Sequence, residues 1–236
     1  FAELRVAHRR TRVFLAKMLG GGRVLAVARG LCVNRMLSVG VDVAGAKAAL
    51  RRADAVCFDF DSTLIAEEGI DELANYCGAG DAVREWTTKA MEGGIKFEDA
   101  LKARLELIRP SRQAVAAFLR DKPPRPSPNA KALVEALKQR GTSVHVISGG
   151  FRAMIEPLAF GELGVDSVFA SVLEWDSESG ASRGFDAAQP TTTRDGGKPA
   201  VIIAELKRTH HDATVVMVGD GATDAQAKPP ADAFIS

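Results

Sequence analysis

The sequence has few cysteines, and proline and glycine do not dominate it. Among 236 residues it holds three cysteines, 10 prolines and 22 glycines, and 6% of the residues are aromatic. Three unevenly spaced cysteines exclude a disulfide framework and a structural zinc site, and they favour a reducing compartment. With 46% hydrophobic and 26% charged residues, the composition excludes collagen-like, low-complexity and wholly disordered chains.

The sequence also lacks a long uncharged stretch. Lys17, Arg23 and Arg29 interrupt the Leu- and Val-rich candidate near the start, whereas a membrane-spanning helix requires about 18 consecutive apolar residues. We therefore expect no membrane partner.

Charge is distributed unevenly along the chain. Residues 1–41 carry eight Lys or Arg and a single acid, for a net charge of +7, and the remaining residues have a net charge of −6. This balance argues against a nucleic-acid partner for the body of the protein. The Arg-rich leader is typical either of an organellar transit segment, mitochondrial or plastid, or of a basic extension on a cytoplasmic protein. Because Ser38 is its single serine, the plastid version is the weaker of the organellar two.

From residue 42 onward, strand and helix patterns alternate, which predicts an α/β fold. Bulky apolar runs typical of buried parallel strands occur at 55–60, 143–147 and 214–218. Ser127, followed by Pro128, is expected to cap a helix that Gly141 ends. Farther on, two short apolar runs on either side of a polar turn at 177–180 resemble a hairpin.

A helical insertion interrupts this alternation. Between residues 70 and 119 apolar side chains recur with helical spacing. They form four groups, Ile70/Leu73/Ala74/Cys77, Val83/Trp86/Ala90, Phe97/Leu101/Leu105/Ile108 and Val115/Phe118/Leu119. The Pro-rich segment 122–128 is expected to be a stiff return from the insertion.

Two aspartates, Asp59 and Asp61, stand at the end of the first predicted strand. With the strand period of two, both carboxylates can point the same way, and ligands of open α/β sheets bind at the carboxyl ends of strands. Close carboxylates repel unless a cation or proton is shared, and a hard ion such as Mg²⁺ would relieve the repulsion. The alternative is an ordinary turn, in which Asp, Ser and Thr are common.

A second pair of aspartates, Asp220 and Asp224, follows the strand predicted at 214–218. Two strands would then deliver acids to one edge of the sheet. Taken singly, this segment is also compatible with a Gly-rich turn whose Asp caps the next helix.

The strand at 143–147 is followed by groups of the opposite character. The hydroxyl of Ser148 and the unhindered amides of Gly149 and Gly150 are typical of an anion cradle at a helix start, although a plain strand-to-helix turn would look similar. Lys198, at the opening of another predicted helix, can place a point charge on a phosphate oxygen, or it is a solvated surface lysine.

Taken together, these segments resemble the four motifs of haloacid-dehalogenase-type phosphatases, and neighbouring segments narrow the resemblance to the phosphoserine phosphatase family. The four motifs are Asp59–Thr63, Ser148–Gly150, Lys198 and Gly219–Asp224. The neighbouring segments are 67–73, 89–91, 103–105, 147–152 and 229–235. The matches run in order from about Ala53 to Ser236, and they do not include the first forty residues.

The resemblance implies roles for the aspartates. Asp59 matches the nucleophile that forms an aspartyl-phosphate intermediate, and Asp61 matches the general acid and base. Mg²⁺ would be held by the Asp59 carboxylate, the backbone carbonyl of Asp61 and Asp220. Asp224 matches a residue at the substrate site that orients the surroundings of the metal.

The resemblance also implies phosphate ligands. Ser148, Gly149, Gly150 and Lys198 match groups that hold and neutralise the phosphate oxygens. Thr223 matches a further substrate contact.

The helical insertion resembles a cap that closes over the site. Two positions in it, and one just before it, match residues that contact the substrate. Arg104 would bind the carboxylate of phosphoserine and Glu68 its ammonium, and Met91 would touch the substrate. From its position near the apolar face of its helix, Arg104 is otherwise a residue whose aliphatic stem packs on the core. Glu92, where the family often has Gly, departs from the pattern, and the chain stops at Ser236, where the family continues with a strand and a helix.

The expected fold is therefore α/β, with a Rossmann-like parallel sheet core of haloacid-dehalogenase type (42–69 and 126–236), a small helical-bundle cap (70–125) and a basic extension (1–41). The expected activity is the Mg²⁺-dependent hydrolysis of O-phospho-L-serine, the last step of serine biosynthesis. The alternatives are a phosphatase or phosphotransferase for another small phosphomonoester, or an inactive phospholigand-binding protein. A homodimer is compatible with the sequence.

Overall fold

The computed structural model describes residues 43–93, 95–186, 192–194, 196–208 and 213–236. The basic leader at 1–41 lies outside these ranges. The helices are α2 (Val43–Arg52), α3 (Gly69–Tyr76), α4 (Gly80–Gly93), α5 (Phe97–Ile108), α6 (Arg112–Asp121), α7 (Ala130–Gln139), α8 (Arg152–Leu158), α9 (Gly197–Val201) and α10 (Ala222–Ala225). The strands are β1 (Ala55–Phe58), β2 (Ser143–Phe151), β3 (Ser167–Ser171), β4 (Leu173–Trp175), β5 (Ser182–Phe185), β6 (Val215–Val218) and β7 (Ala233–Ile235). Three wider turns, η1 (Phe60–Leu64), η2 (Ala159–Leu163) and η3 (Ile202–Lys207), complete the list.

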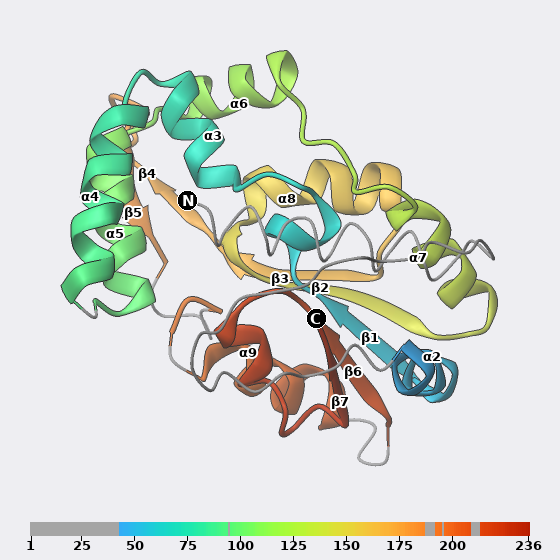
Figure 1. Cartoon of the computed structure of the whole chain (residues 1–236). Helices are drawn as coiled ribbons and strands as arrows, with labels where there is room; N and C mark the ends of the chain where they lie inside the picture. The colour runs from blue at the N-terminus through green and yellow to red at the C-terminus, as the bar shows by residue number, and fades with distance from the viewer. Residues whose placement is uncertain (1–42, 94, 187–191, 195, 209–212) are drawn as a thin grey trace, which may run out of the picture.

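A five-stranded parallel sheet with the order β3-β2-β1-β6-β7 forms the centre of the molecule (Figure 1). The three strands predicted from apolar runs are its three central members. All four residues of β1 are buried, as expected for a strand that is covered on both faces of a parallel sheet. The prediction of an α/β fold with a parallel sheet is confirmed.

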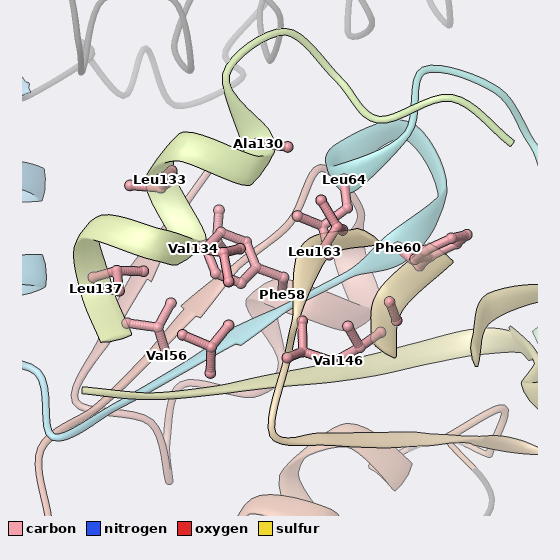
Figure 2. Packing of buried hydrophobic residues seen from close by; sticks show 14 of the residues in the cluster. Val56, Phe58, Phe60, Leu64, Ala130, Leu133, Val134, Leu137, Val146 and Leu163 are labelled. Atoms are coloured by element: carbon pink, nitrogen blue, oxygen red, sulfur yellow. The ribbon is translucent and has the colours of Figure 1, made fainter. Parts of the chain in front are cut away.

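Alternate residues of the strands pack against helices on opposite faces of the sheet. On one face Val56 and Phe58 lie under the apolar side of α7, and α2 and α8 join the same cluster (Figure 2). On the other face Cys57 packs against Val201 and Ile202, where α9 continues into η3. Burying each such side chain contributes about 1.5–3 kcal/mol, so the two clusters fix the register that brings the strand ends together.

Aspartate side chains tie neighbouring strands together at the amino-terminal edge of the sheet. In each case a carboxylate beside one strand accepts a hydrogen bond from the backbone amide at the start of another. The pairs are Asp54 with Thr214 (2.7 Å), Asp166 with Val144 (2.8 Å) and Asp232 with Val215 (2.8 Å). This edge is therefore structural, and the opposite edge is available for a site.

Helix α7 starts differently from the sequence-based expectation. Its N-cap is Asn129, in the left-handed conformation with φ of 67°, and not Ser127. Ser127 is buried, and its amide donates to the carbonyl of Leu64 at 2.7 Å. Ser127 is therefore held against the end of η1. A turn from Ser127 to Ala130, closed by the Ala130 amide donating to the Ser127 carbonyl at 3.0 Å, precedes the helix. Gly141, with φ of 81°, follows the helix as predicted.

The predicted helical insertion consists of α3, α4, α5 and α6, which lie beside the carboxyl end of the sheet (Figure 1). Its buried residues share one cluster with Phe151 and Met154 of the sheet domain and with Leu173 and Phe185 of the β4–β5 hairpin. The hairpin contacts the α5–α6 junction through its backbone: the Arg112 amide donates to Gly180 O at 2.9 Å. None of the described helices is long and apolar enough to cross a bilayer.

One buried histidine makes the stability of the sheet sensitive to pH. His145 of β2 lies between the hydroxyls of Ser167 (2.6 Å from Nδ1) and Ser143 (2.9 Å from Nε2). Burial lowers its pKa, and the charge of Asp166 opposes this shift in part. The ring is thus neutral in the folded protein at a pH where the unfolded chain already takes up a proton.

We expect the free energy of unfolding to decrease as the pH falls below about 6.5, the ordinary histidine pKa. The slope that His145 adds is at most about 1.4 kcal/mol per pH unit. Urea unfolding between pH 8 and pH 5 should show a shallower decrease for His145→Gln than for the wild type. Parallel curves for the two proteins would mean that His145 does not titrate differently on unfolding.

Candidate active site

A cavity of about 380 Å³ lies between the carboxyl end of the sheet and the helical insertion. It is lined by segments that follow β1 and β6, by the end of β2, by the start of α9, and by α3 and α5. Most of the residues predicted from the sequence line it, namely Asp59, Asp61, Glu68, Arg104, Ser148, Gly149, Gly150, Lys198, Asp220 and Thr223. Asp224 is fully buried. Met91 and Glu92 belong to α4, and their side chains lie outside the described part of the chain.

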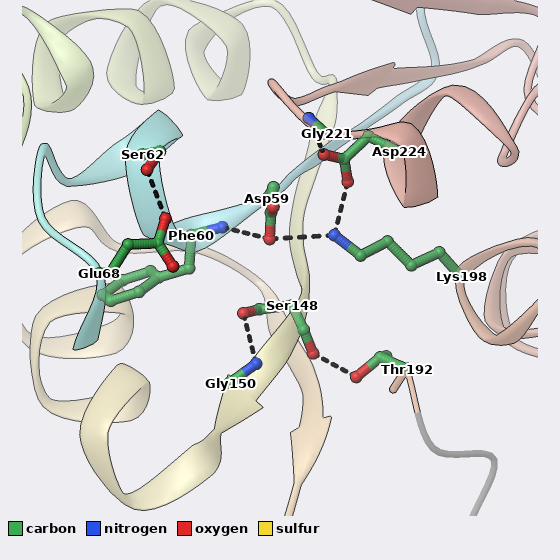
Figure 3. A network of polar contacts seen from close by, with 10 residues as sticks. All are labelled: Asp59, Phe60, Ser62, Glu68, Ser148, Gly150, Thr192, Lys198, Gly221 and Asp224. Atoms are coloured by element: carbon green, nitrogen blue, oxygen red, sulfur yellow. Dashed lines mark hydrogen bonds and ion pairs between the residues drawn. The ribbon is translucent and has the colours of Figure 1, made fainter. Parts of the chain in front are cut away.

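The carboxylate of Asp59 lies at the floor of the cavity, directly after β1. Its Oδ1 atom accepts a hydrogen bond from the Phe60 amide at 2.8 Å and lies 3.0 Å from Nζ of Lys198 (Figure 3). Burial raises the pKa of Asp59 to about 7, helped by the negative charge of Asp224, whereas Lys198 lowers it. Lys198 thus favours the ionised form of a carboxylate that burial would otherwise protonate.

Lys198 is itself buried, with 3% of its side chain exposed, and it is held by two carboxylates. Its Nζ atom lies 2.5 Å from Oδ1 of Asp224, whose Oδ2 accepts from the Gly221 amide at 2.9 Å (Figure 3). Burial alone would lower the pKa of Lys198, but Asp59 and Asp224 raise it. The two carboxylates therefore favour the charged ammonium, and the ion pair with Asp224 holds it beside Asp59.

Asp61 reaches the same cavity from the turn η1. The strand ends at Phe58, two residues before the sequence pattern suggests, so the turn and not the strand period directs Asp61. Its Oδ1 atom accepts from the Gly69 amide at 2.9 Å, and a Cβ atom at Gly69 would lie 3.2 Å from that oxygen. Burial, followed by the charges of Glu68 and Asp59, raises the pKa of Asp61 well above its usual value, which favours a protonated carboxyl.

The predicted anion cradle occupies the last residues of β2. Because β2 runs to Phe151 and α8 starts at Arg152, Ser148, Gly149 and Gly150 belong to a strand end and not to a helix start as predicted. The Gly150 amide donates to Oγ of Ser148 at 2.9 Å (Figure 3). The hydroxyl proton of Ser148 remains available to an acceptor in the cavity.

Two side chains of opposite charge line the cavity, one from the helical insertion and one from the residue just before it. Arg104 of α5 is 13% exposed, its Nη1 lies 3.7 Å from Oδ1 of Asp71, and its buried Nε has no hydrogen-bond partner within the described ranges. Glu68 accepts from the Ser62 hydroxyl at 2.5 Å. Burial raises the pKa of Glu68, and the Ser62 hydrogen bond opposes that shift. Arg104 and Glu68 thus line the same cavity as Asp59, and the part of the lining that they form is called its wall below.

The acidic residues are close enough to share a cation. Carboxylate oxygens of Asp59, Asp220 and Asp224 lie within 4.8 Å of one another. An all-oxygen set suits a hard divalent ion such as Mg²⁺ better than a soft one. Both oxygens of Asp224 are engaged, Oδ1 by Lys198 and Oδ2 by the Gly221 amide, whereas both contacts of Asp59 fall on its Oδ1. Asp59 is therefore better suited than Asp224 as a metal ligand.

Sequence reasoning missed two residues at the cavity. Phe97, expected on the buried side of α5, is 43% exposed, because it stands in the first turn of that helix and leans over the end of β2. A Cβ atom at Gly149 would lie 2.7 Å from its ring. Thr192, which is 3% exposed and lines the cavity, gave no signal in sequence because it belongs to no periodic element.

The buried Lys198 can be compared with an exposed lysine in a matched experiment. Lys198→Met leaves Asp59 and Asp224 buried without their cation, so we expect the free energy of unfolding to fall by about 3–5 kcal/mol. Lys102→Met removes a lysine from an exposed pair with Glu98, in which the lysine side chain is 47% exposed, and should change it by less than about 1 kcal/mol. Urea unfolding in the presence of a chelator measures both. Equal effects would contradict the central position given to Lys198.

Comparison with known proteins identifies the family. The model of the haloacid dehalogenase-like hydrolases matches residues 53–229. A phosphoserine phosphatase of Bos taurus is 51% identical over 185 residues, which cover 78% of this chain and 80% of the relative. A chloroplastic phosphoserine phosphatase of Arabidopsis thaliana is 48% identical over 189 residues, covering 78% of this chain and 63% of the relative.

A solved structure of similar fold is described as a phospho-aspartyl intermediate analogue of phosphoserine phosphatase. It has a TM-score of 0.61 and 27% sequence identity, and the match covers 78% of this chain and 93% of that one. The parallel sheet, the acids at its carboxyl edge and these matches agree. The chain belongs to the haloacid dehalogenase-like hydrolases and, within them, to the phosphoserine phosphatases.

Proposed function

We propose that the protein hydrolyses O-phospho-L-serine to L-serine and phosphate through a phosphorylated Asp59, the reaction that ends serine biosynthesis. One observation carries the proposal: the Asp59 carboxylate, paired with a buried lysine, lines a cavity whose wall also holds Arg104 and Glu68. The floor suits a phosphate, and the wall suits a zwitterionic amino acid. The relatives named phosphoserine phosphatase support this assignment.

In the first half of the reaction, the ionised Asp59 carboxylate attacks phosphorus and the bond to the seryl oxygen breaks. Lys198 and the Ser148 hydroxyl hold the phosphate oxygens while charge redistributes. Asp61 donates its proton to the leaving oxygen, a role that its raised pKa supports, because a raised pKa favours the protonated carboxyl that the step requires.

In the second half, water attacks the phosphorus atom of the aspartyl phosphate. Asp61, now ionised, accepts a proton from that water, and the bond between phosphorus and Asp59 breaks to release phosphate. Each residue thus returns to its starting state. To act first as acid and then as base, the Asp61 carboxyl must stay within reach of both the seryl oxygen and the attacking water. Its hydrogen bond from the Gly69 amide would hold it in such a position.

We assign Mg²⁺ to the acidic cluster, with Asp59, Asp220 and the backbone carbonyl of Asp61 as the groups that would hold it. When bound, the ion would neutralise charge on the phosphoryl oxygens. Asp224 keeps Lys198 in place beside this cluster, and Thr223, which lines the cavity, is the proposed further contact with substrate.

Substrate choice is assigned to the wall of the cavity. Arg104 would pair with the substrate carboxylate through its guanidinium fork, including the Nε that has no protein partner in the described structure. Glu68 would accept from the ammonium group. We assign 70–125 as a cap that excludes water during the reaction, with 42–69 and 126–236 as the core.

The nucleophile is tested by Asp59→Asn. Because an amide does not attack phosphorus, phosphate release from O-phospho-L-serine should fall by at least about 10³-fold, and the wild-type activity should disappear on chelation of Mg²⁺. Asp81→Asn, which changes a residue of α4 whose side chain is 98% exposed, should keep full activity. Undiminished release by Asp59→Asn would reject the mechanism.

The recognition wall is tested by Arg104→Lys. Loss of the bidentate fork should raise KM for O-phospho-L-serine by about tenfold or more and reduce the preference for this substrate over phosphothreonine and glycerol phosphate. Arg120→Lys, at a residue whose side chain is 71% exposed, is the matched control. If the wild type turned over all three compounds equally, the broader assignment to small phosphomonoesters would replace the one made here.

A further inference from the structure

The carbonyl group of Ser148 has an unusual hydrogen-bond partner. Pairing between β1 and β2 ends at Val146, and the register of β2 with β3 shifts after Ile147 and resumes at Phe151. The strand therefore leaves the regular ladder where the cavity begins. A buried carbonyl in such a position needs another donor.

The donor is the hydroxyl of Thr192, a residue 44 positions away in sequence (Figure 3). Thr192 is 3% exposed, so water does not compete freely for this bond. The contact joins the segment that precedes α9 to the end of β2. Because the bond reaches the backbone of Ser148, it constrains the direction of both the Ser148 side chain and the amides that follow it.

The same segment leads to Lys198. Gly197 donates to the carbonyl of Arg194 at 2.8 Å, in a turn that opens α9 and places Lys198 as its second residue. The Thr192 hydroxyl thus links the segment that leads to Lys198 with the strand β2, which carries Ser148.

We propose that Thr192 is a positioning residue, whose hydrogen bond to the Ser148 carbonyl sets the spacing between the Ser148–Gly150 cradle and Lys198. This inference rests on the proposed function, because it takes phosphate as the ligand of both groups. It assigns Thr192 no contact with the reacting atoms. Loss of the bond widens the cradle and weakens the binding of any phosphate-bearing ligand, substrate and product alike.

Thr192→Val removes the hydroxyl and keeps the shape of the side chain. We expect it to weaken binding of inorganic phosphate, measured by calorimetry with Mg²⁺ present, by about 5- to 20-fold, the usual loss for one buried hydrogen bond. KM for O-phospho-L-serine should rise by a similar factor, and kcat should change less. Thr192→Ser, which keeps the hydroxyl, should restore both values to within about twofold of the wild type. If the valine variant does not fold, Thr192→Ala carries the same expectation.

The neighbouring residue provides the matched control. Thr193 is 2% exposed, and its hydroxyl has no hydrogen-bond partner in the portion of the chain described here. Thr193→Val should leave phosphate affinity unchanged and the melting temperature equal or higher. The inference is overturned if folded Thr192→Val binds phosphate as the wild type does, or if both valine variants weaken binding equally. A wild type that binds phosphate without hydrolysing O-phospho-L-serine would overturn the proposed function, and phosphate affinity would still test Thr192.

Discussion

The placement of one ammonium group between two carboxylates governs the site. Lys198 sits in the protein interior, where an unpaired charge would be costly, and the pair formed by Asp59 and Asp224 makes its burial tolerable. In return the lysine lowers the pKa of Asp59, which burial raises to about 7, and so favours the ionised form of this carboxylate. The same three groups therefore bear on both the stability and the proposed reaction, and a substitution at any of them is expected to change both.

The sheet supplies the geometry that this charge arrangement needs. Parallel strands end on one edge, so the chain delivers Asp59, Ser148 and Asp220 to neighbouring points although they are far apart in sequence. The opposite edge is closed by aspartates that bond the backbone of the next strand. Polar side chains thus bond the backbone at the amino-terminal edge of the sheet and line the cavity at its carboxyl-terminal edge. The apolar faces between the two edges keep the strands in register.

Much of this arrangement could be predicted from local patterns. Buried apolar runs marked the three central strands, helical spacing marked the insertion, and acids directly after strands marked the edge where Asp59 and Asp220 meet. Contacts between distant segments could not be predicted this way. Phe97 fits the helical period yet faces Gly149. Thr192 bonds the Ser148 carbonyl at a point where the register of the folded strand shifts. A sequence pattern describes a single helix or strand, whereas these two residues make contacts between different segments of the chain.

The β4–β5 hairpin connects the parallel sheet with the helical insertion. It follows the sheet strand β3 in sequence, yet its backbone forms hydrogen bonds with the α5–α6 junction. The Arg112 amide donates to the Gly180 carbonyl, and the Ser182 amide donates to the Pro110 carbonyl. The guanidinium of Arg112 also lies over the ring of Trp175, 5.6 Å from its centroid. Its apolar residues belong to the cluster of the helical insertion. The insertion and the hairpin consequently form one packing unit. Exchange of the four helices between relatives would have to carry the hairpin along, and the two segments are expected to diversify together during evolution.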